Sequence, residues 1–162
     1  MLVGITGDTH NNLKNISTIC KLFNEVKPEL VIHTGDITLP KSLESFSELN
    51  MPLVGVFGNN DQEEKEGLIA ASEKFNCSLF EEPYLLKTNG RKIYILHHPD
   101  LINKNMSIKG DFIVHGHTHR YRSEIINNSL IFNPGECAGF LEGKNKIGLL
   151  DLEKKISNTI SF

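Results

Sequence analysis

The sequence predicts an α/β protein, in the broad sense that includes α+β folds, with two β-sheets packed face to face and helices outside. Before Pro83, short apolar runs alternate with segments whose apolar residues recur at helical spacing. After Pro83 the pattern changes to short strands joined by turns. An α/β half followed by a mainly β half favours two layered sheets. With 39% hydrophobic residues in 162, we expect one domain, residues 1–162.

The first half begins with a buried strand at 2–5 and a helix from residue 13 to about Lys27, which Pro28 ends. A strand at 30–32 completes a β-α-β unit, whose crossover is right-handed in nearly all proteins. A second helix is predicted at 41–49, with Leu43, Phe46 and Leu49 facing inward. A third strand at 52–57 precedes a third helix, rich in Glu at its start, that runs from just after Asp61 to about Phe75.

The second half contains two hairpins and three further strands. Strands at 84–87 and 92–96 flank Asn89-Gly90, a strong two-residue turn signal. Strands at 124–126 and 130–132 flank Asn127-Asn128. The remaining strands are predicted at 111–115, 146–152 and 156–162.

Composition narrows the functional class. The formal net charge is −3, and no block of Lys and Arg marks a surface for nucleic acid or an anionic membrane. Three widely spaced cysteines give no disulfide framework and fit a reducing compartment. No signal-peptide pattern begins the chain, and no apolar run approaches the roughly 18 residues of a membrane span. We therefore expect a cytoplasmic protein without a membrane partner.

Polar residues with metal-binding side chains follow five of the predicted strands. In an open α/β sheet, ligands bind in the crevice outside the carboxyl ends of the strands. We therefore hypothesise that these five edges converge on two metal ions, with the carboxylate of Asp36 bridging them. The residues, in the order of their strands, are Asp8 and His10, Asp36, Asn59, His97, and His117 and His119.

Each of these segments alone also has an ordinary interpretation as a turn or a helix cap. Their combination is harder to explain in that way, since five of the seven histidines lie between positions 97 and 119. A different interpretation treats His115, His117 and His119 as a single zinc site of three histidines. That interpretation leaves Asp8, Asp36 and Asn59 without a role.

The ordered motifs resemble those of the calcineurin-like metallophosphoesterases. The family pattern runs D-x-H, G-D, G-N-x-D/E, a His after a strand, and G-H-x-H. It is matched here by Asp8-Thr9-His10, Gly35-Asp36, Gly58-Asn59-Asn60-Asp61, His97 and Gly116-His117-Thr118-His119. The compact length and the turn Asn133-Pro134-Gly135-Glu136 are similar to the small stand-alone YfcE-type branch. The resemblance implies a four-layer αββα sandwich of two mixed sheets flanked by helices.

The resemblance also implies a ligand set. Asp8, His10, Asp36 and His119 would hold one ion, and Asp36, Asn59, His97 and His117 the other. Mixed imidazole and carboxylate ligands suit several metals; manganese is the first expectation, with nickel, iron or zinc as alternatives. The expected function is a dinuclear phosphodiesterase in which a hydroxide bridging the ions attacks phosphorus in line. Asp36, Asn59 and His97 are then expected to take part in catalysis.

Two positions depart from the family pattern. Asn60 stands where many relatives have a His that protonates the leaving oxygen, so phosphodiesters with good leaving groups are favoured over monoesters. His98 stands where the family usually has Gly, and it is either a substitute acid or a surface residue. Asn60 and His98 are candidate substrate contacts. His33 and His115 are interpreted as structural, and Arg120 as a phosphate contact or a solvated charge.

The expected partner is a small phosphodiester substrate, and the resemblance is compatible with a homodimer. The alternative function is a protein-interaction scaffold of the same fold, as in the retromer subunit that resembles this branch. That relative has a degraded metal site, whereas every expected ligand is present here.

Overall fold

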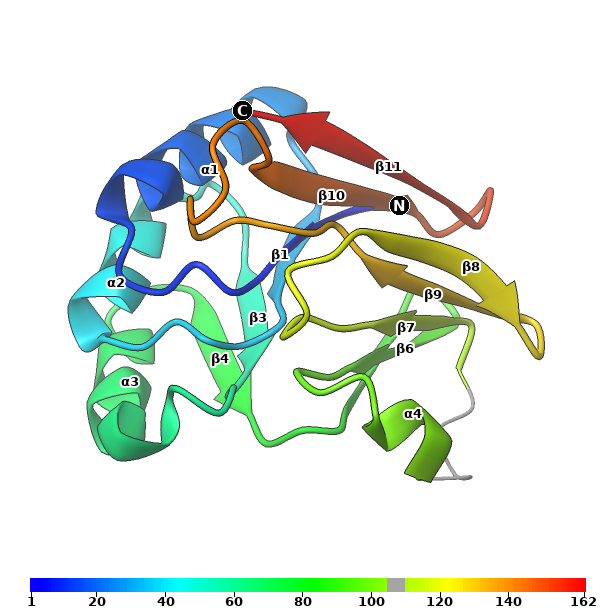
Figure 1. Cartoon of the computed structure of the whole chain (residues 1–162), viewed down its shortest axis with the longest axis horizontal. Helices are drawn as coiled ribbons and strands as arrows, with labels where there is room; N and C mark the ends of the chain where they lie inside the picture. Colours follow the sequence, from blue (N-terminus) through cyan, green and yellow to red (C-terminus); the bar gives the residue numbers. More distant parts are fainter. Residues whose placement is uncertain (105–109) are drawn as a thin grey trace.

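The computed structural model describes residues 1–104 and 110–162. Within these residues the strands form a six-stranded and a five-stranded sheet, both mixed, with helices over the outer face of the larger one (Figure 1). Apolar residues of the two sheets share one buried cluster between them. The predicted arrangement of two packed sheets with helices outside is confirmed.

The six-stranded sheet has the order β11-β10-β1-β2-β3-β4. Strands β1 to β4 run parallel, and β10 and β11 are antiparallel additions next to β1. All were predicted except β4, which pairs with β3 at one edge. Their bounds are β1 Leu2–Thr6, β2 Leu30–His33, β3 Leu53–Val56, β4 Cys77–Phe80, β10 Lys146–Asp151 and β11 Ile156–Ser161.

The five-stranded sheet has the order β5-β6-β7-β9-β8. Strands β6, β7 and β9 run parallel, and each outer strand is joined to its neighbour by a predicted hairpin. The turn residues Asn89, Gly90, Asn127 and Asn128 all have positive φ, as a two-residue hairpin turn requires. The bounds are β5 Tyr84–Thr88, β6 Arg91–Ile95, β7 Phe112–Val114, β8 Arg122–Ile126 and β9 Ser129–Asn133.

Three helices cover the six-stranded sheet. The first, α1 (Leu13–Val26), ends as predicted, with Lys27 in the left-handed conformation and Pro28 after it. The predicted helix at 41–49 is instead α2 (Pro40–Glu44) followed by a 3-10 turn, Ser45–Glu48. The third is a 3-10 turn, Gln62–Glu64, and then α3 (Lys65–Ser72), which ends about three residues earlier than expected.

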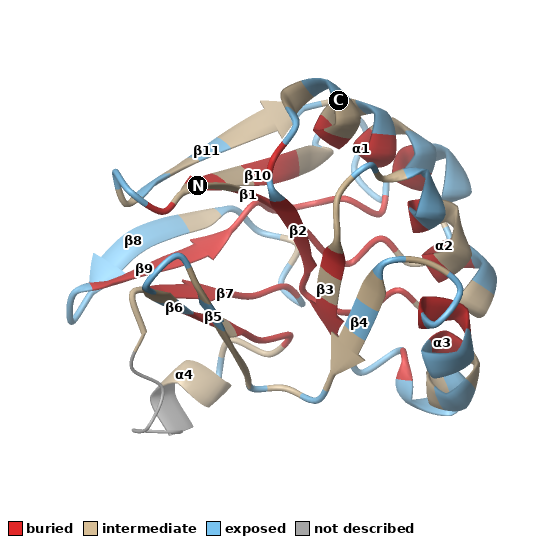
Figure 2. Cartoon of the chain, turned by 180° about the vertical axis from the view of Figure 1, so that it is seen from behind, coloured by how far each residue is buried: buried red, intermediate tan, exposed pale blue. Residues whose placement is uncertain are grey.

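The buried residues lie in successive layers (Figure 2). Val3 and Ile5 of β1 face the second sheet, whereas Gly4 between them faces Phe23 of α1. On the outer side of the second sheet, Ile113 and Ile131 contact a short helix, α4 (Leu101–Lys104), through residues such as Leu101. The helix, sheet, sheet, helix order matches the expected sandwich.

None of the helices in residues 1–104 and 110–162 is both long enough and apolar enough to span a bilayer.

Candidate metal centre

Five loops at the carboxyl ends of β1, β2, β3, β6 and β7 bring the predicted site residues close together. Short backbone bonds join neighbouring loops: the Asp8 amide donates to the Gly35 carbonyl at 2.8 Å, and the His10 amide to the Asp36 carbonyl at 2.9 Å. A bond between the sheets completes the arrangement, since the His117 amide donates to both carboxylate oxygens of Asp8 at 2.9 and 3.0 Å. The loops therefore support one another across the crevice.

Five of the site residues have a left-handed backbone, which side chains other than Gly rarely adopt. Their φ angles are 50° for Asp8, 46° for His10, 58° for Asp36, 67° for His117 and 54° for His119. Such conformations cost of the order of 1–3 kcal/mol each and cluster at functional sites. None of the five residues is a glycine, so this strain could not be predicted from the sequence.

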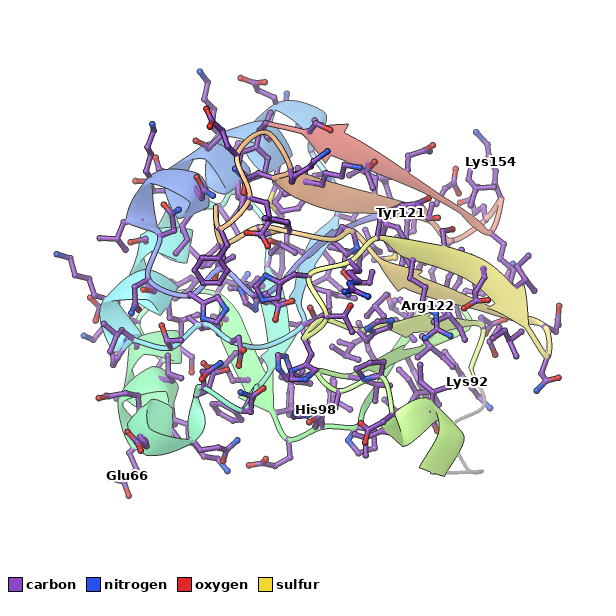
Figure 3. All side chains as sticks on the ribbon, viewed as in Figure 1. Glu66, Lys92, His98, Tyr121, Arg122 and Lys154 are labelled. Atoms are coloured by element: carbon purple, nitrogen blue, oxygen red, sulfur yellow. The ribbon has the colours of Figure 1, made fainter. Side chains whose placement is uncertain are left out.

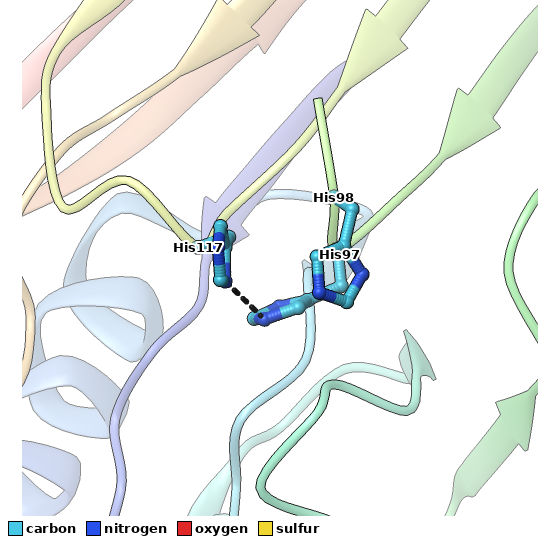
Figure 4. Close-up of side chains that lie close together, drawn as sticks. All are labelled: His97, His98 and His117. Carbon is cyan, nitrogen blue, oxygen red and sulfur yellow. Dashed lines mark hydrogen bonds between the residues drawn. The ribbon is translucent and has the colours of Figure 1, made fainter. Parts of the chain in front are cut away.

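The first group of ligand atoms comes from Asn59, His97 and His117. His97 Nε2 lies 2.9 Å from Asn59 Oδ1, and His117 Nδ1 lies 3.0 Å from the same oxygen. The two ring nitrogens are 3.2 Å apart, and Figure 4 shows the rings of His97 and His117 directed toward each other. The other ring nitrogen of His97, Nδ1, is 2.9 Å from the Thr34 carbonyl and must donate to it.

The three polar atoms of this group have too few protons to form hydrogen bonds with one another. His97 Nε2 and Asn59 Oδ1 both present lone pairs, and at most one proton, on His117 Nδ1, is available between the three atoms. Burial lowers the pKa of His97, so its ring is neutral near pH 7. A cation at this point would bind the lone pairs of His97 Nε2 and Asn59 Oδ1, and that of His117 Nδ1 when this nitrogen carries no proton, so the residues fit a metal ion.

The second group comes from Asp8, His10 and His119. His119 Nε2 is 3.8 Å from Asp8 Oδ1, and the rings of His10 and His119 stack with centroids 5.5 Å apart. His10 Nε2 is buried and has no hydrogen-bond partner among the described residues. A buried polar atom without a partner is costly. A bound metal would remove that cost.

Burial also sets the charges in the second group. It lowers the pKa of His10, which favours a neutral ring with a free lone pair. It raises the pKa of Asp8 to about 7, because the buried carboxylate is poorly solvated. A cation beside Asp8 would stabilise the charged form.

Asp36 lies between the two groups. Its Oδ1 is 3.5 Å from His97 Nε2, and its Oδ2 is 4.0 Å from His10 Nε2. Asn60 holds both oxygens, through its backbone amide at 2.9 Å and its side-chain amide at 2.7 Å. Although burial alone would raise it, the pKa of Asp36 is lowered by these bonds from Asn60 and by His97.

Three further carboxylates support the candidate ligands, and the sequence did not single out any of them for this role. Asp61 is fully buried and accepts the amides of Gly58, Asp36, Ile37 and Thr38 at 2.7–2.9 Å. It therefore fixes the loops of Asn59 and Asp36 against each other. Only the position of Asp61 in the G-N-x-D motif could have drawn attention to it.

The other two carboxylates, Glu82 and Glu136, hold histidines. Glu136 Oε2 is 2.6 Å from His119 Nδ1, which leaves Nε2 of that ring to face Asp8. Glu82 accepts the amides of His97 and His98 at 2.6 and 2.9 Å, and its other oxygen is 2.6 Å from His98 Nδ1. Sequence reasoning could not find Glu82, because a Glu in a loop looks like a solvated charge.

His98 lies beside the first group. Its ring centroid is 4.6 Å from that of His117, and Figure 3 shows it near the middle of the molecule. His33 and His115 are buried beneath the site; His33 bonds Thr9 and the Gly35 amide. Arg120 is exposed. Among the described residues, three sets of His and carboxylate ligand atoms lie within 4.8 Å of one another: His97, His98 and His117; Asp8, His10 and His119; and Asp8, Asp36 and His97.

Comparison with known proteins identifies the family. A family model described as the calcineurin-like phosphoesterase superfamily domain matches residues 1–155. The chain belongs to this family. Phosphodiesterase MJ0936 of Methanocaldococcus jannaschii is 35% identical over 161 residues, which cover 96% of this chain and 95% of the relative. The motif-based resemblance is confirmed.

Solved structures agree. A structure described as a novel archaeal phosphodiesterase has a TM-score of 0.86 at 33% identity and covers 100% of both chains. YfcE, a phosphoesterase from E. coli, has a TM-score of 0.74 and covers 99% of both chains; at 17% identity it supports the fold alone. The chain is thus a member of a family of metal-dependent phosphoesterase hydrolases. Its own side chains include groups that could hold a metal ion.

Proposed function

We propose that this protein is a phosphodiesterase that works with two divalent metal ions. The observation that carries the proposal is the position of Asp36, whose two oxygens face two separate groups of ligand atoms. In the proposed assignment, one ion is held by Asp8, His10, Asp36 and His119. The other is held by Asp36, Asn59, His97 and His117. The donor set suits manganese, our first choice, and also nickel, iron or zinc.

When bound, such a pair of ions supplies an activated water as nucleophile and positive charge for the phosphoryl oxygens. The chain itself keeps that charge from being cancelled. Among the proposed ligands only Asp8 and Asp36 are acidic, and the others are neutral imidazole and amide groups. The site can therefore attract a phosphate anion although the net charge of the chain is −3.

The residues around the ligands favour diesters with good leaving groups. The side-chain amide of Asn60 donates a hydrogen bond to Asp36 Oδ2. An amide cannot supply a proton to a departing oxygen. His98 remains a candidate substrate contact, because Glu82 holds its ring beside His117 with 32% of the side chain exposed. The partner that we propose is accordingly a small phosphodiester.

The test uses protein stripped of metal, with Mn, Ni, Zn and Mg added back singly. We would measure metal content and the hydrolysis of bis(para-nitrophenyl) phosphate and para-nitrophenyl phosphate, which share a leaving group. We expect two ions per chain and turnover that favours the diester. One ion per chain would support the three-histidine zinc site instead. Two ions without turnover of either ester would contradict the proposal and favour the scaffold.

A further inference from the structure

An exposed aromatic ring lies against the histidines of the second ligand group. Phe140 is 69% exposed, the largest exposed fraction among the large hydrophobic side chains that the structure describes. Its ring centroid is 5.5 Å from that of His119 at an interplanar angle of 18°, and 5.3 Å from that of His10. The next residue, Leu141, is 57% exposed. Apolar surface therefore adjoins the proposed metal site.

The loop between β9 and β10 holds Phe140 in this position. The carboxylate of Glu136 contacts both the backbone of Phe140 and the ring of His119. Glu136 Oε1 accepts the Phe140 amide at 2.7 Å, while Oε2 is 2.6 Å from His119 Nδ1. The start of α1 fixes the same loop, which Figure 1 draws in orange beside that helix. Asn12 and Asn15 donate side-chain amides to the Ala138 and Cys137 carbonyls, each at 2.8 Å.

Gly139 allows this close approach. Its φ is 80°, and a Cβ there would lie 2.7 Å from Asn12 Nδ2, closer than such atoms come. Hydrogen bonds to the carbonyls before Gly139 and from the amide of Phe140 after it thus constrain the backbone of this loop. An exposed Phe on a tightly held loop is better explained by a ligand that it contacts than by packing, because most of its surface remains in solvent.

We propose that Phe140 is a stacking platform for a flat aromatic group esterified to the phosphate. This inference rests on the proposed function and specifies its substrate class. The ring of Phe140 lies beside His10 and His119, so an ester group that extends from a bound phosphoryl group past these two histidines would meet it. Aromatic side chains bind nucleobases and aryl groups by stacking, with little dependence on their exact identity. The substrate class is a phosphodiester with a nucleoside or aryl group on this side.

A purely structural role is the alternative to be distinguished, because Phe140 also covers part of His119. A covering role would affect metal binding and every phosphate ligand alike. A platform would affect only ligands that carry a flat group. The two roles therefore predict different results for a pair of ligands that share the phosphoryl group.

The experiment measures binding of phenylphosphonate and methylphosphonate to the metal-loaded protein by calorimetry, since neither ligand can be hydrolysed at its C–P bond. We expect the phenyl compound to bind about tenfold more tightly to the wild type, from typical stacking contributions. Phe140→Ala should remove this preference and leave methylphosphonate affinity and metal content unchanged. Phe140→Tyr should keep the preference. Ile125→Ala, which alters a similarly exposed apolar residue on β8, is the matched control and should change nothing.

Equal affinity of the wild type for both phosphonates would overturn the platform while leaving the proposed function intact. So would an equal loss of both affinities in Phe140→Ala, which is the result of a covering role. Failure of the wild type to bind either phosphonate, with two ions present, would instead contradict the proposed function itself. Phe140→Leu provides a second variant that keeps an apolar side chain but removes the flat ring, and it should also lose the preference.

Discussion

Asp36 differs from the other proposed ligands because each of its oxygens faces a different group of ligand atoms. Asp36→Asn should therefore weaken both ions together. We expect a loss of affinity larger than the roughly 10- to 100-fold that follows removal of a residue that only supports a ligand. Metal titration followed by elemental analysis measures both sites.

Asp111→Asn is a suitable control, because Asp111 bonds Arg91 and the Lys92 amide on the second sheet, apart from the ligands. This variant should bind both ions as the wild type does. If Asp36→Asn loses one ion and keeps the other at full affinity, Asp36 is not a bridge.

At the level of single residues, the sequence could predict that the candidate ligands meet at one place, but it could not predict the carboxylates that hold them. His and Asp directly after buried strands are conspicuous in a sequence, since those side chains meet at one edge of a sheet. Asp61, Glu82 and Glu136 carry out their roles through contacts with segments distant in the chain. Their residue types are common on solvated loops, so only the folded structure distinguishes them.

At the level of elements, the errors of the sequence prediction have identifiable causes. Leu43, Phe46 and Leu49 are spaced by three residues, which fits a 3-10 turn as well as an α-helix, and the chain changes from one to the other at Ser45. The strand β4 was missed because it is a four-residue edge strand without a buried residue. By contrast, α1 and both hairpins had strong local signals, and these elements were predicted within one or two residues.

The contact between β1 and α1 depends on Gly4. A Cβ at this position would lie 2.6 Å from Cε1 of Phe23, whose ring is fully buried. Gly4→Ala should therefore lower the free energy of unfolding by about 1–3 kcal/mol through overpacking. Urea unfolding of Gly4→Ala, Phe23→Leu and the double variant gives the coupling between the two positions. The smaller Leu should offset part of the loss, whereas strictly additive effects would mean that the added methyl group is accommodated elsewhere.

The stability of the whole molecule should depend on pH through its buried histidines. Burial lowers the pKa of His33 to about 3 and that of His115 to about 4, from the ordinary value of 6.5. The unfolded chain therefore binds protons below pH 6.5 that the folded chain does not bind. Stability falls as the pH is lowered, by up to about 1.4 kcal/mol per pH unit for each group. The Gly35 amide also donates to Nδ1 of the buried His33 ring at 3.2 Å, a bond that protonation of Nδ1 would break.

His33→Gln isolates this contribution, because Gln cannot titrate but can still accept and donate hydrogen bonds. At pH 7 the metal-free wild type should be the more stable protein. Its advantage over the variant should shrink by about 1 kcal/mol for each pH unit below 6.5, since only the wild type has this buried ring to protonate on unfolding. Burial of Asp8 works in the opposite direction in both proteins, because its raised pKa lets the folded state take up a proton first, and it cancels in the comparison. Urea unfolding at pH 7, 6 and 5 measures the difference, and a constant advantage across this range would mean that His33 titrates in the folded protein as it does in solvent.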